Sequence, residues 1–123
     1  MNEKKTILYV DDEPLNLMLF EVNFKRNFNV ITSLSGFDAL EKLNSNPEIS
    51  IVVSDMKMPK MNGIEFITHA KKSFSSIYYF ILTGLDESKE IVEAIENKLI
   101  QNYFCKPINM KIIEQRIEEA IVN

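Results

Sequence analysis

The architecture of this chain is set near its start by the run Ile7-Leu8-Tyr9-Val10-Asp11-Asp12-Glu13-Pro14. Its apolar half has the length and composition of a short buried strand. The run then stops at two adjacent acids, and Pro14 suits the first turn of a helix, where its missing N–H leaves no hydrogen bond unmade. A buried strand that passes directly into a helix predicts the first strand–helix unit of a parallel sheet.

The same alternation continues to the end of the chain. Further apolar runs cover 28–33, 49–54, 78–82 and 103–105. Predicted helices cover 14–26, 35–44, a segment around 64–70, a segment opened by Asp86 and Glu87, and a last segment capped by Asn109. Their helical spacing predicts these inward-facing residues: Leu17, Phe20, Phe24, Phe37, Leu40, Leu43, Ile64, Ile67, Ala70, Ile91, Ala94, Ile95, Ile112, Ile113, Ile117, Ala120 and Ile121. Five strands alternating with five helices predict an α/β fold whose parallel strands are joined by right-handed crossovers.

Length and composition narrow the class of protein. A chain of 123 residues suits one domain over 1–123. Its net charge of −4 offers no basic surface for nucleic acid or an anionic membrane. We expect a cytoplasmic protein without a signal peptide or a membrane span. The lone Cys105 fits a reducing compartment, and its apolar neighbours predict a buried thiol.

Side chains that can bind a cation or a phosphoryl group stand where four of the predicted strands end. Asp11 and Asp12 follow the first strand, Asp55 the third, Thr83 the fourth and Lys106 the fifth. Parallel strands end at one edge of the sheet, where open α/β folds bind ligands. Carboxylates gathered there repel one another unless a cation joins them. The pattern predicts that Asp55 forms an aspartyl phosphate, that Asp12 and Asp55 ligate Mg²⁺, and that Asp11 assists directly or through water.

Each of these residues also has an ordinary structural interpretation. Asp55 can cap the loop after its strand, and Asp11 and Asp12 can stabilise the start of the next helix through its dipole. Lys106 can be a solvated surface lysine, and Thr83 a β-branched strand residue. Their joint occurrence at matching strand ends favours a phosphoryl site, in which Lys106 meets phosphate oxygens and the Thr83 hydroxyl donates to one of them.

Together these motifs make the chain similar to the receiver domains of two-component response regulators. The resemblance covers essentially the whole chain and rests on Asp11-Asp12, Ser54-Asp55, Met58-Pro59-Lys60-Met61-Asn62-Gly63, Thr83-Gly84 and Lys106-Pro107. It implies a doubly wound, flavodoxin-like five-stranded parallel sheet with strand order 2-1-3-4-5. Two small departures are Gly84, where the family more often has alanine, and Asn62, where aspartate is frequent.

The resemblance also implies a phosphorelay function. A sensor histidine kinase or a phosphotransfer protein would pass a phosphoryl group to Asp55. Mg²⁺ (or Mn²⁺) would be held by Asp11, Asp12, Asp55 and the backbone carbonyl of Lys57. Thr83 and Tyr103 would form the switch pair, Lys106 would bind the phosphate, and the Lys106–Pro107 peptide bond would be cis. Such a protein catalyses its own phosphorylation and dephosphorylation as a signalling switch and is not a turnover enzyme.

The output surface is expected on the fourth helix, fifth strand and fifth helix, where an effector domain or a second copy would bind. A haloacid-dehalogenase-like phosphatase is disfavoured because its Asp-x-Asp motif follows the first strand, where Glu13 stands in place of the second acid. A degenerate receiver that acts only as an interaction module is disfavoured by the complete set of acids, threonine and lysine. His69 lies on the third predicted helix, so we expect a surface histidine and not a phosphodonor.

Overall fold

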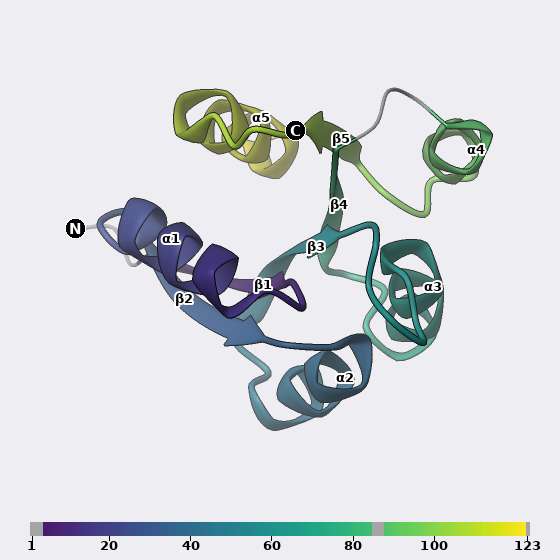
Figure 1. Ribbon diagram of the computed structural model, residues 1–123, viewed down its shortest axis with the longest axis horizontal. Coiled ribbons are helices and arrows are strands. Elements are labelled where there is room, and N and C mark those ends of the chain that lie inside the picture. The colour runs from purple at the N-terminus through teal and green to yellow at the C-terminus, as the bar shows by residue number, and fades with distance from the viewer. Residues whose placement is uncertain (1–3, 85–87, 123) are drawn as a thin grey trace.

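The computed structural model describes residues 4–84 and 88–122, and Figure 1 shows their alternating strands and helices. The strands are β1 (Lys5–Val10), β2 (Phe28–Ser33), β3 (Ile49–Asp55), β4 (Tyr78–Thr83) and β5 (Asn102–Cys105). The helices are α1 (Pro14–Phe24), α2 (Gly36–Ser45), α3 (Gly63–Ser73), α4 (Lys89–Glu96) and α5 (Met110–Val122). Among the residues described, none of these helices combines the length and the apolar composition needed to cross a membrane.

The strands form one parallel sheet in the order β2-β1-β3-β4-β5, which confirms the predicted topology. Helices α1 and α5 cover one face, and α2, α3 and α4 cover the other (Figure 1). The first strand and the strand that carries Asp55 are central neighbours, with Val10 opposite Ser54. Because β1 and β3 are parallel neighbours, their carboxyl ends lie side by side at one edge of the sheet.

Both faces of the sheet are buried, and successive residues of a strand serve opposite layers. In β1, Leu8 and Val10 belong to the apolar cluster shared with α2, α3 and α4. Tyr9 belongs to the cluster shared with α1 and α5. There the ring of Phe20 stacks on Tyr9 with ring centroids 4.0 Å apart and an interplanar angle of 2°. This packing fixes the position of the carboxyl end of β1, where the acidic pair follows.

The predicted inward orientation of two helix residues is wrong. Phe37 is 54% exposed and Ile112 is 46% exposed. The buried side of α2 is formed by Gly36, Ala39 and Leu43, and Phe37 lies one residue after Gly36, about 100° around the helix. Ile112 is displaced in the same way from its buried neighbour Ile113. Apolar spacing alone did not distinguish the side that meets the sheet.

The predicted burial of the Cys105 thiol is also wrong, because Cys105 is exposed. It ends β5, which lies at the edge of the sheet. The start predicted for the fourth helix at Asp86 and Glu87 lies outside the described residues. Helix α4 begins at Lys89, and its first turn is capped by the Ser88 hydroxyl. Asn109 caps α5 as predicted, since its side-chain oxygen accepts a hydrogen bond from the Ile112 N–H at 3.2 Å.

Candidate active site

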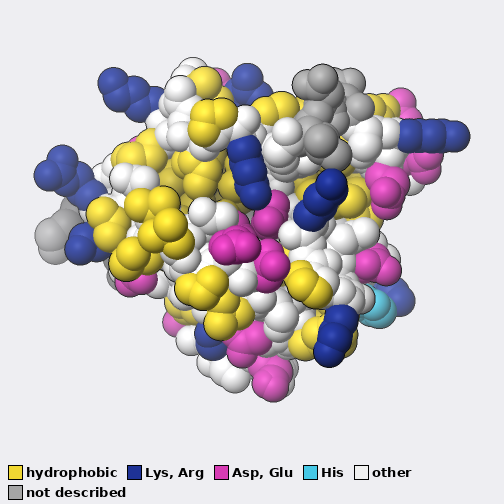
Figure 2. Space-filling model, in the orientation of Figure 1, with side chains coloured by type: hydrophobic (Ala, Val, Ile, Leu, Met, Phe, Trp, Pro, Cys, Tyr) yellow, Lys and Arg dark blue, Asp and Glu magenta, His cyan; other side chains and the backbone are white. Residues whose placement is uncertain are grey.

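The predicted site residues meet where the central strands end. Asp55 is the last residue of β3, and Asp11 directly follows β1. Because side chains alternate along a strand, Asp55 faces the same layer as Val53 and Asp11 the same layer as Tyr9. Both carboxylates therefore lie on the side of the sheet covered by α1 and α5. Figure 2 shows acidic side chains gathered near the middle of the face in view, with Lys or Arg side chains beside them.

Asp11, Asp12 and Asp55 form a compact acidic cluster. Each offers one carboxylate oxygen, and these oxygens lie within 4.8 Å of one another. Asp11 is fully buried, Asp55 is 5% exposed, and Asp12 is half-buried. Burial, followed by the charge of Asp11, raises the pKa of Asp55, although Lys106 opposes the change. Carboxylates held this close in a poorly hydrated place are unfavourable in the absence of a cation.

Lys106 provides one positive charge at the cluster. Its Nζ lies 3.1 Å from Oδ1 of Asp55, and about a third of its side chain is exposed. The backbone N–H of Lys106 donates to the Thr83 carbonyl at 2.7 Å, which fixes the start of the loop after β5. The Lys106–Pro107 peptide bond is cis, as the resemblance implied. The lysine therefore approaches the Asp55 carboxylate directly from the loop after β5.

A hydrogen-bond network around Asp11 was not anticipated from the sequence. The Tyr9 hydroxyl donates to Asp11 Oδ2 at 2.7 Å, and the Asn16 side-chain amide donates to the same oxygen at 3.1 Å. The Glu13 backbone N–H donates to Oδ1 at 3.0 Å. Burial raises the pKa of the Tyr9 phenol, so the hydroxyl keeps its proton and stays a donor. The available signal was the spacing of Tyr9 and Asp11, because residues two apart in a strand share a face.

By alternation along their strands, Thr83 and Tyr103 belong to the layer covered by α4, and Thr83 ends β4 at the same sheet edge as Asp55. Thr83 has the same alternation as Ile81, and Tyr103 packs against the cluster that contains Ile81. In the β4–β5 register Ile81 pairs with Tyr103 and Thr83 with Cys105. Thr83 and Tyr103 are therefore diagonal neighbours on the face covered by α4. Thr83 is buried and Tyr103 is half-buried.

The loop after β3 is held tightly against the end of that strand. The Gly63 N–H donates to the Met56 carbonyl at 2.9 Å, and a Cβ added at Gly63 would lie 2.5 Å from the Asp55 carbonyl oxygen. Only glycine allows α3 to start this close to the backbone of Asp55. Asn62 caps α3 in a reciprocal pair of hydrogen bonds with Glu65. Asn62 therefore has a structural role as the N-terminal cap of α3.

Two further residues were considered from the sequence. Lys57 lies in the loop two residues after Asp55, and its side chain is exposed. The part assigned to its backbone carbonyl stays a prediction. His69 is exposed on α3, on the opposite side of the sheet from the acidic cluster, which agrees with its interpretation as a surface histidine.

The donor set of the cluster suits a hard divalent cation. Mg²⁺ takes oxygen ligands and commonly needs only one or two carboxylates besides waters and phosphate oxygens. The oxygens of Asp11, Asp12 and Asp55 are close enough to share one ion. Burial raises the pKa of Asp55 most and the charge of Asp11 adds to it, and a cation here would offset that second effect. On chemical grounds the residues present fit magnesium.

Known proteins share this fold and sequence pattern. The chain is 28% identical over 108 residues to the hydrogenase transcriptional regulatory protein HoxA of Cupriavidus necator, covering 87% of this chain and 22% of that protein. The chain thus spans about a fifth of that relative. A receiver domain protein from Clostridium thermocellum matches with a TM-score of 0.87 and 28% identity, over 94% of this chain and 93% of that one. The CheX–CheY–BeF3–Mg complex from Borrelia burgdorferi matches with a TM-score of 0.86 and 25% identity, over 96% and 90% of the two chains.

A family model gives the most direct assignment. The model of the response regulator receiver domain matches residues 7–118, which include every residue of the site just described. The strand order and the placement of the acids at the strand ends agree with this match. The chain belongs to the response regulator receiver domain family.

Proposed function

We propose that this chain is a phosphoacceptor switch in a two-component phosphorelay and that Asp55 receives the phosphoryl group. The observation that carries the proposal is the buried acidic cluster with Lys106 Nζ 3.1 Å from Asp55 Oδ1. A fold needs neither three converging carboxylates nor a lysine reaching over them for its stability, since burying charge is costly. The complete set supports retained chemistry over a degenerate receiver that acts only as an interaction module.

The proposed transfer needs a nucleophile, an incoming phosphoryl group and a leaving group. An oxygen of Asp55 forms a bond to phosphorus while the bond from phosphorus to the donor's imidazole nitrogen breaks, and the imidazole keeps that electron pair. Lys106 is placed to contact a phosphoryl oxygen once its partner carboxylate is phosphorylated. Mg²⁺ (or Mn²⁺), held by Asp11, Asp12, Asp55 and the Lys57 carbonyl, would offset negative charge on the transferring group.

The switch is proposed to run through β4 and β5. Thr83 ends β4 directly beside the acceptor strand, since Asp55 pairs with Leu82. A phosphoryl oxygen on Asp55 offers the Thr83 hydroxyl a new acceptor, and movement of Thr83 changes the space beside its diagonal neighbour Tyr103. Phosphate would thereby bias a two-state equilibrium through contacts made in only one state.

The outer face of α1 supports docking of the phosphodonor next to the site. Four large apolar side chains on it are 46–59% exposed, and their spacing of three and four residues aligns them in one stripe. They are Leu15, Met18, Leu19 and Val22. Figure 2 shows apolar side chains gathered over α1 and close to the acidic centre of the view. A sensor histidine kinase or phosphotransfer protein must bring its histidine to Asp55, so we propose that it covers this stripe with an apolar surface of its own.

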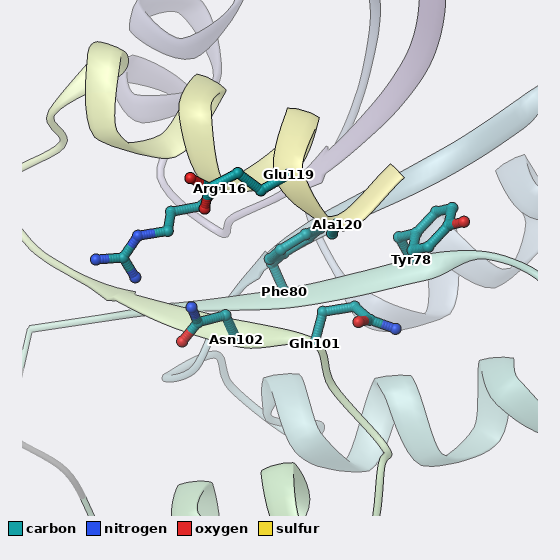
Figure 3. Close-up of a pocket in the computed structure, with 7 residues that line it drawn as sticks. All are labelled: Tyr78, Phe80, Gln101, Asn102, Arg116, Glu119 and Ala120. Atoms are coloured by element: carbon teal, nitrogen blue, oxygen red, sulfur yellow. The ribbon is translucent and has the colours of Figure 1, made fainter. Parts of the chain in front are cut away.

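The output surface is proposed on α4, β5 and α5. Two adjoining cavities of about 450 and 420 Å³ run between β5 and α5 and share Asn102 and Arg116. Figure 3 shows the first, with Arg116 and Glu119 on α5 above Gln101 and Asn102. Charges of both signs on this groove could pair with those of a second copy, which we propose as its occupant. Exposed ion pairs contribute only about 0–1 kcal/mol each, so such a dimer should be weak.

Further parts of the proposal concern the protein as a whole. We propose one receiver domain over residues 1–123, acting in the cytoplasm as a switch and not as a turnover enzyme. The net charge of −4 supports a role without direct nucleic-acid binding. An effector would then be a separate protein or a further domain.

Chemical labelling tests the acceptor assignment. Incubation with acetyl phosphate and Mg²⁺ should add one phosphate by intact mass, and chelation with EDTA or the Asp12→Ala change should suppress it. Asp38→Asn serves as the matched control, because Asp38 lies on α2 in a surface pair with Lys42. Equal labelling of Asp55→Asn and the wild type would refute Asp55 as the acceptor.

A further inference from the structure

The Asp11 side chain is held from three directions although it is a candidate metal ligand. Tyr9 and Asn16 donate to Oδ2, and the Glu13 N–H donates to Oδ1. A carboxylate has about four acceptor positions, two on each oxygen. Both positions of Oδ2 are therefore occupied, and one position remains on Oδ1. Asp11 can offer a cation a single bond, direct or through water, and the direction of that bond is set by the donors on Oδ2.

The principal donor is itself rigid. Tyr9 is fully buried in β1, and its ring stacks on Phe20, which in turn stacks on Phe24 with centroids 4.2 Å apart. At 2.7 Å, the Tyr9–Asp11 hydrogen bond is the shortest of the three contacts to Asp11. A hydrogen bond from a fixed phenol to a carboxylate is charge-assisted and strongly directional. The aromatic packing between β1 and α1 thus determines how the Asp11 carboxylate is rotated.

We propose that Tyr9 is a positioning residue for the divalent cation: by holding Oδ2 of Asp11 it presents Oδ1 toward Asp12 and Asp55. This inference rests on the proposed function, because it takes the acidic cluster to be the magnesium site. Residues that orient metal ligands commonly change metal affinity by about 10- to 100-fold when they are removed. Without the phenol, Oδ2 of Asp11 keeps only the longer hydrogen bond from Asn16 at 3.1 Å, so the carboxylate can rotate more and binding must restore the lost order.

A purely structural role for Tyr9 makes a different prediction. Loss of a buried hydrogen bond would then lower stability but leave the affinity of the folded protein for Mg²⁺ unchanged. Tyr79 provides a matched control. It is 1% exposed, and its hydroxyl donates to the Phe74 carbonyl at 2.8 Å, on the side of the sheet away from the acidic cluster. Tyr79→Phe therefore removes a hydrogen bond of similar length from a buried tyrosine without touching Asp11.

The experiment is a titration of the full chain with MgCl₂, followed by ¹⁵N–¹H NMR shifts of the amides at Asp12, Met56 and Lys57, with thermal unfolding measured in parallel. Tyr9→Phe keeps the ring and its stacking, so the variant should fold. We expect its dissociation constant for Mg²⁺ to rise about 10-fold, whereas that of Tyr79→Phe should stay within about two-fold of the wild type even if both variants melt at lower temperature.

The outcomes separate the two proposals. Saturable shifts in the wild type with an unchanged dissociation constant in Tyr9→Phe would overturn the positioning role and leave the magnesium site standing. Tighter binding by Tyr9→Phe would overturn it too, because the phenol would then only compete for the carboxylate. An absence of saturable shifts in the wild type would overturn both the positioning role and the magnesium part of the proposed function, while labelling of Asp55 would still be tested separately.

Discussion

Replacing Asp55 by asparagine should stabilise the metal-free protein at neutral pH. The change keeps the shape of the side chain and removes one charge from a cluster whose oxygens lie within 4.8 Å of one another. Natural proteins commonly give up stability at functional sites, where selection acts on chemistry. A purely structural Asp55, paired with Lys106, would instead make the substitution destabilising.

The magnitude follows from the distances. At an effective dielectric constant of about 20, two unit charges 4.8 Å apart repel by about 3.5 kcal/mol, and Asp55 faces two such neighbours. On the same basis its contact with Lys106 at 3.1 Å contributes about 5 kcal/mol of attraction. Lys106 and Asp12 are both partly exposed, so solvent screening reduces the attraction by the lysine and also the repulsion by Asp12. We expect a net gain of about 1–2 kcal/mol, or about 4–8 °C in melting temperature for a chain of this size.

The stability that Asp55→Asn gains over the wild type should increase with pH. The pKa of Asp55 is raised in the folded state, so the wild type is relatively more stable when this group is protonated. That contribution is complete below the ordinary aspartate pKa of about 3.9 and is lost as the pH rises through the folded value. The Asp55→Asn variant has no such group. The stability difference should therefore be near zero at about pH 3.5 and largest at pH 7.

Urea unfolding at several pH values, without metal, measures this difference directly. Asp38→Asn on α2 is the control, since Asp38 pairs with Lys42 at 3.3 Å on the surface and away from the acidic cluster. Its effect should stay within about 0.5 kcal/mol. Mg²⁺ at ten times its dissociation constant should stabilise the wild type by about 1.4 kcal/mol and so narrow the gap. A variant that is less stable than the wild type at pH 7, or a gap that does not change with pH, would refute the reasoning.

Three other outcomes test neighbouring parts of the site. A structure with beryllofluoride and Mg²⁺ should show Thr83 moved toward Asp55 and Tyr103 turned inward, and unchanged positions would count against the switch. Sedimentation with the same additives should show a tighter dimer, and a monomer with and without them would count against the homodimer. Gly63→Ala should destabilise the fold by about 1–3 kcal/mol in urea unfolding, because its new Cβ would meet backbone at 2.5 Å; Gly84→Ala, whose Cβ would lie 3.8 Å from the Lys106 side chain, should be nearly neutral. Met18→Asp should weaken binding to a phosphodonor protein by at least about 10-fold, while labelling of Asp55 by acetyl phosphate stays normal. An equal loss of binding and of labelling would contradict docking at α1.

Several features of the fold were predictable because their causes are local. Strands with buried faces on both sides appear as short apolar runs, and helices appear as apolar residues three and four apart. The parallel order then required that Asp11, Asp55, Thr83 and Lys106 lie at one edge of the sheet. Their close approach was predictable for the same reason, because the end of a strand fixes the place of the side chains that stand there.

Other features depend on contacts between distant parts of the chain. The exposure of Phe37 and Cys105 could not be read locally, since apolar composition does not say which side of a helix or which strand another element covers. The exposed stripe of α1 could not be predicted locally either, because apolar residues on several sides of a helix do not show which side packs against the sheet. A hydrogen bond such as that from Tyr9 to Asp11 requires a precise rotation of both side chains, and that rotation is set by the stacking of Phe20 from another element. The sequence by itself thus determined the order of the elements and the acids at their ends, through periodicity and strand direction, whereas tertiary packing alone decided which faces were covered and how the carboxylates were turned.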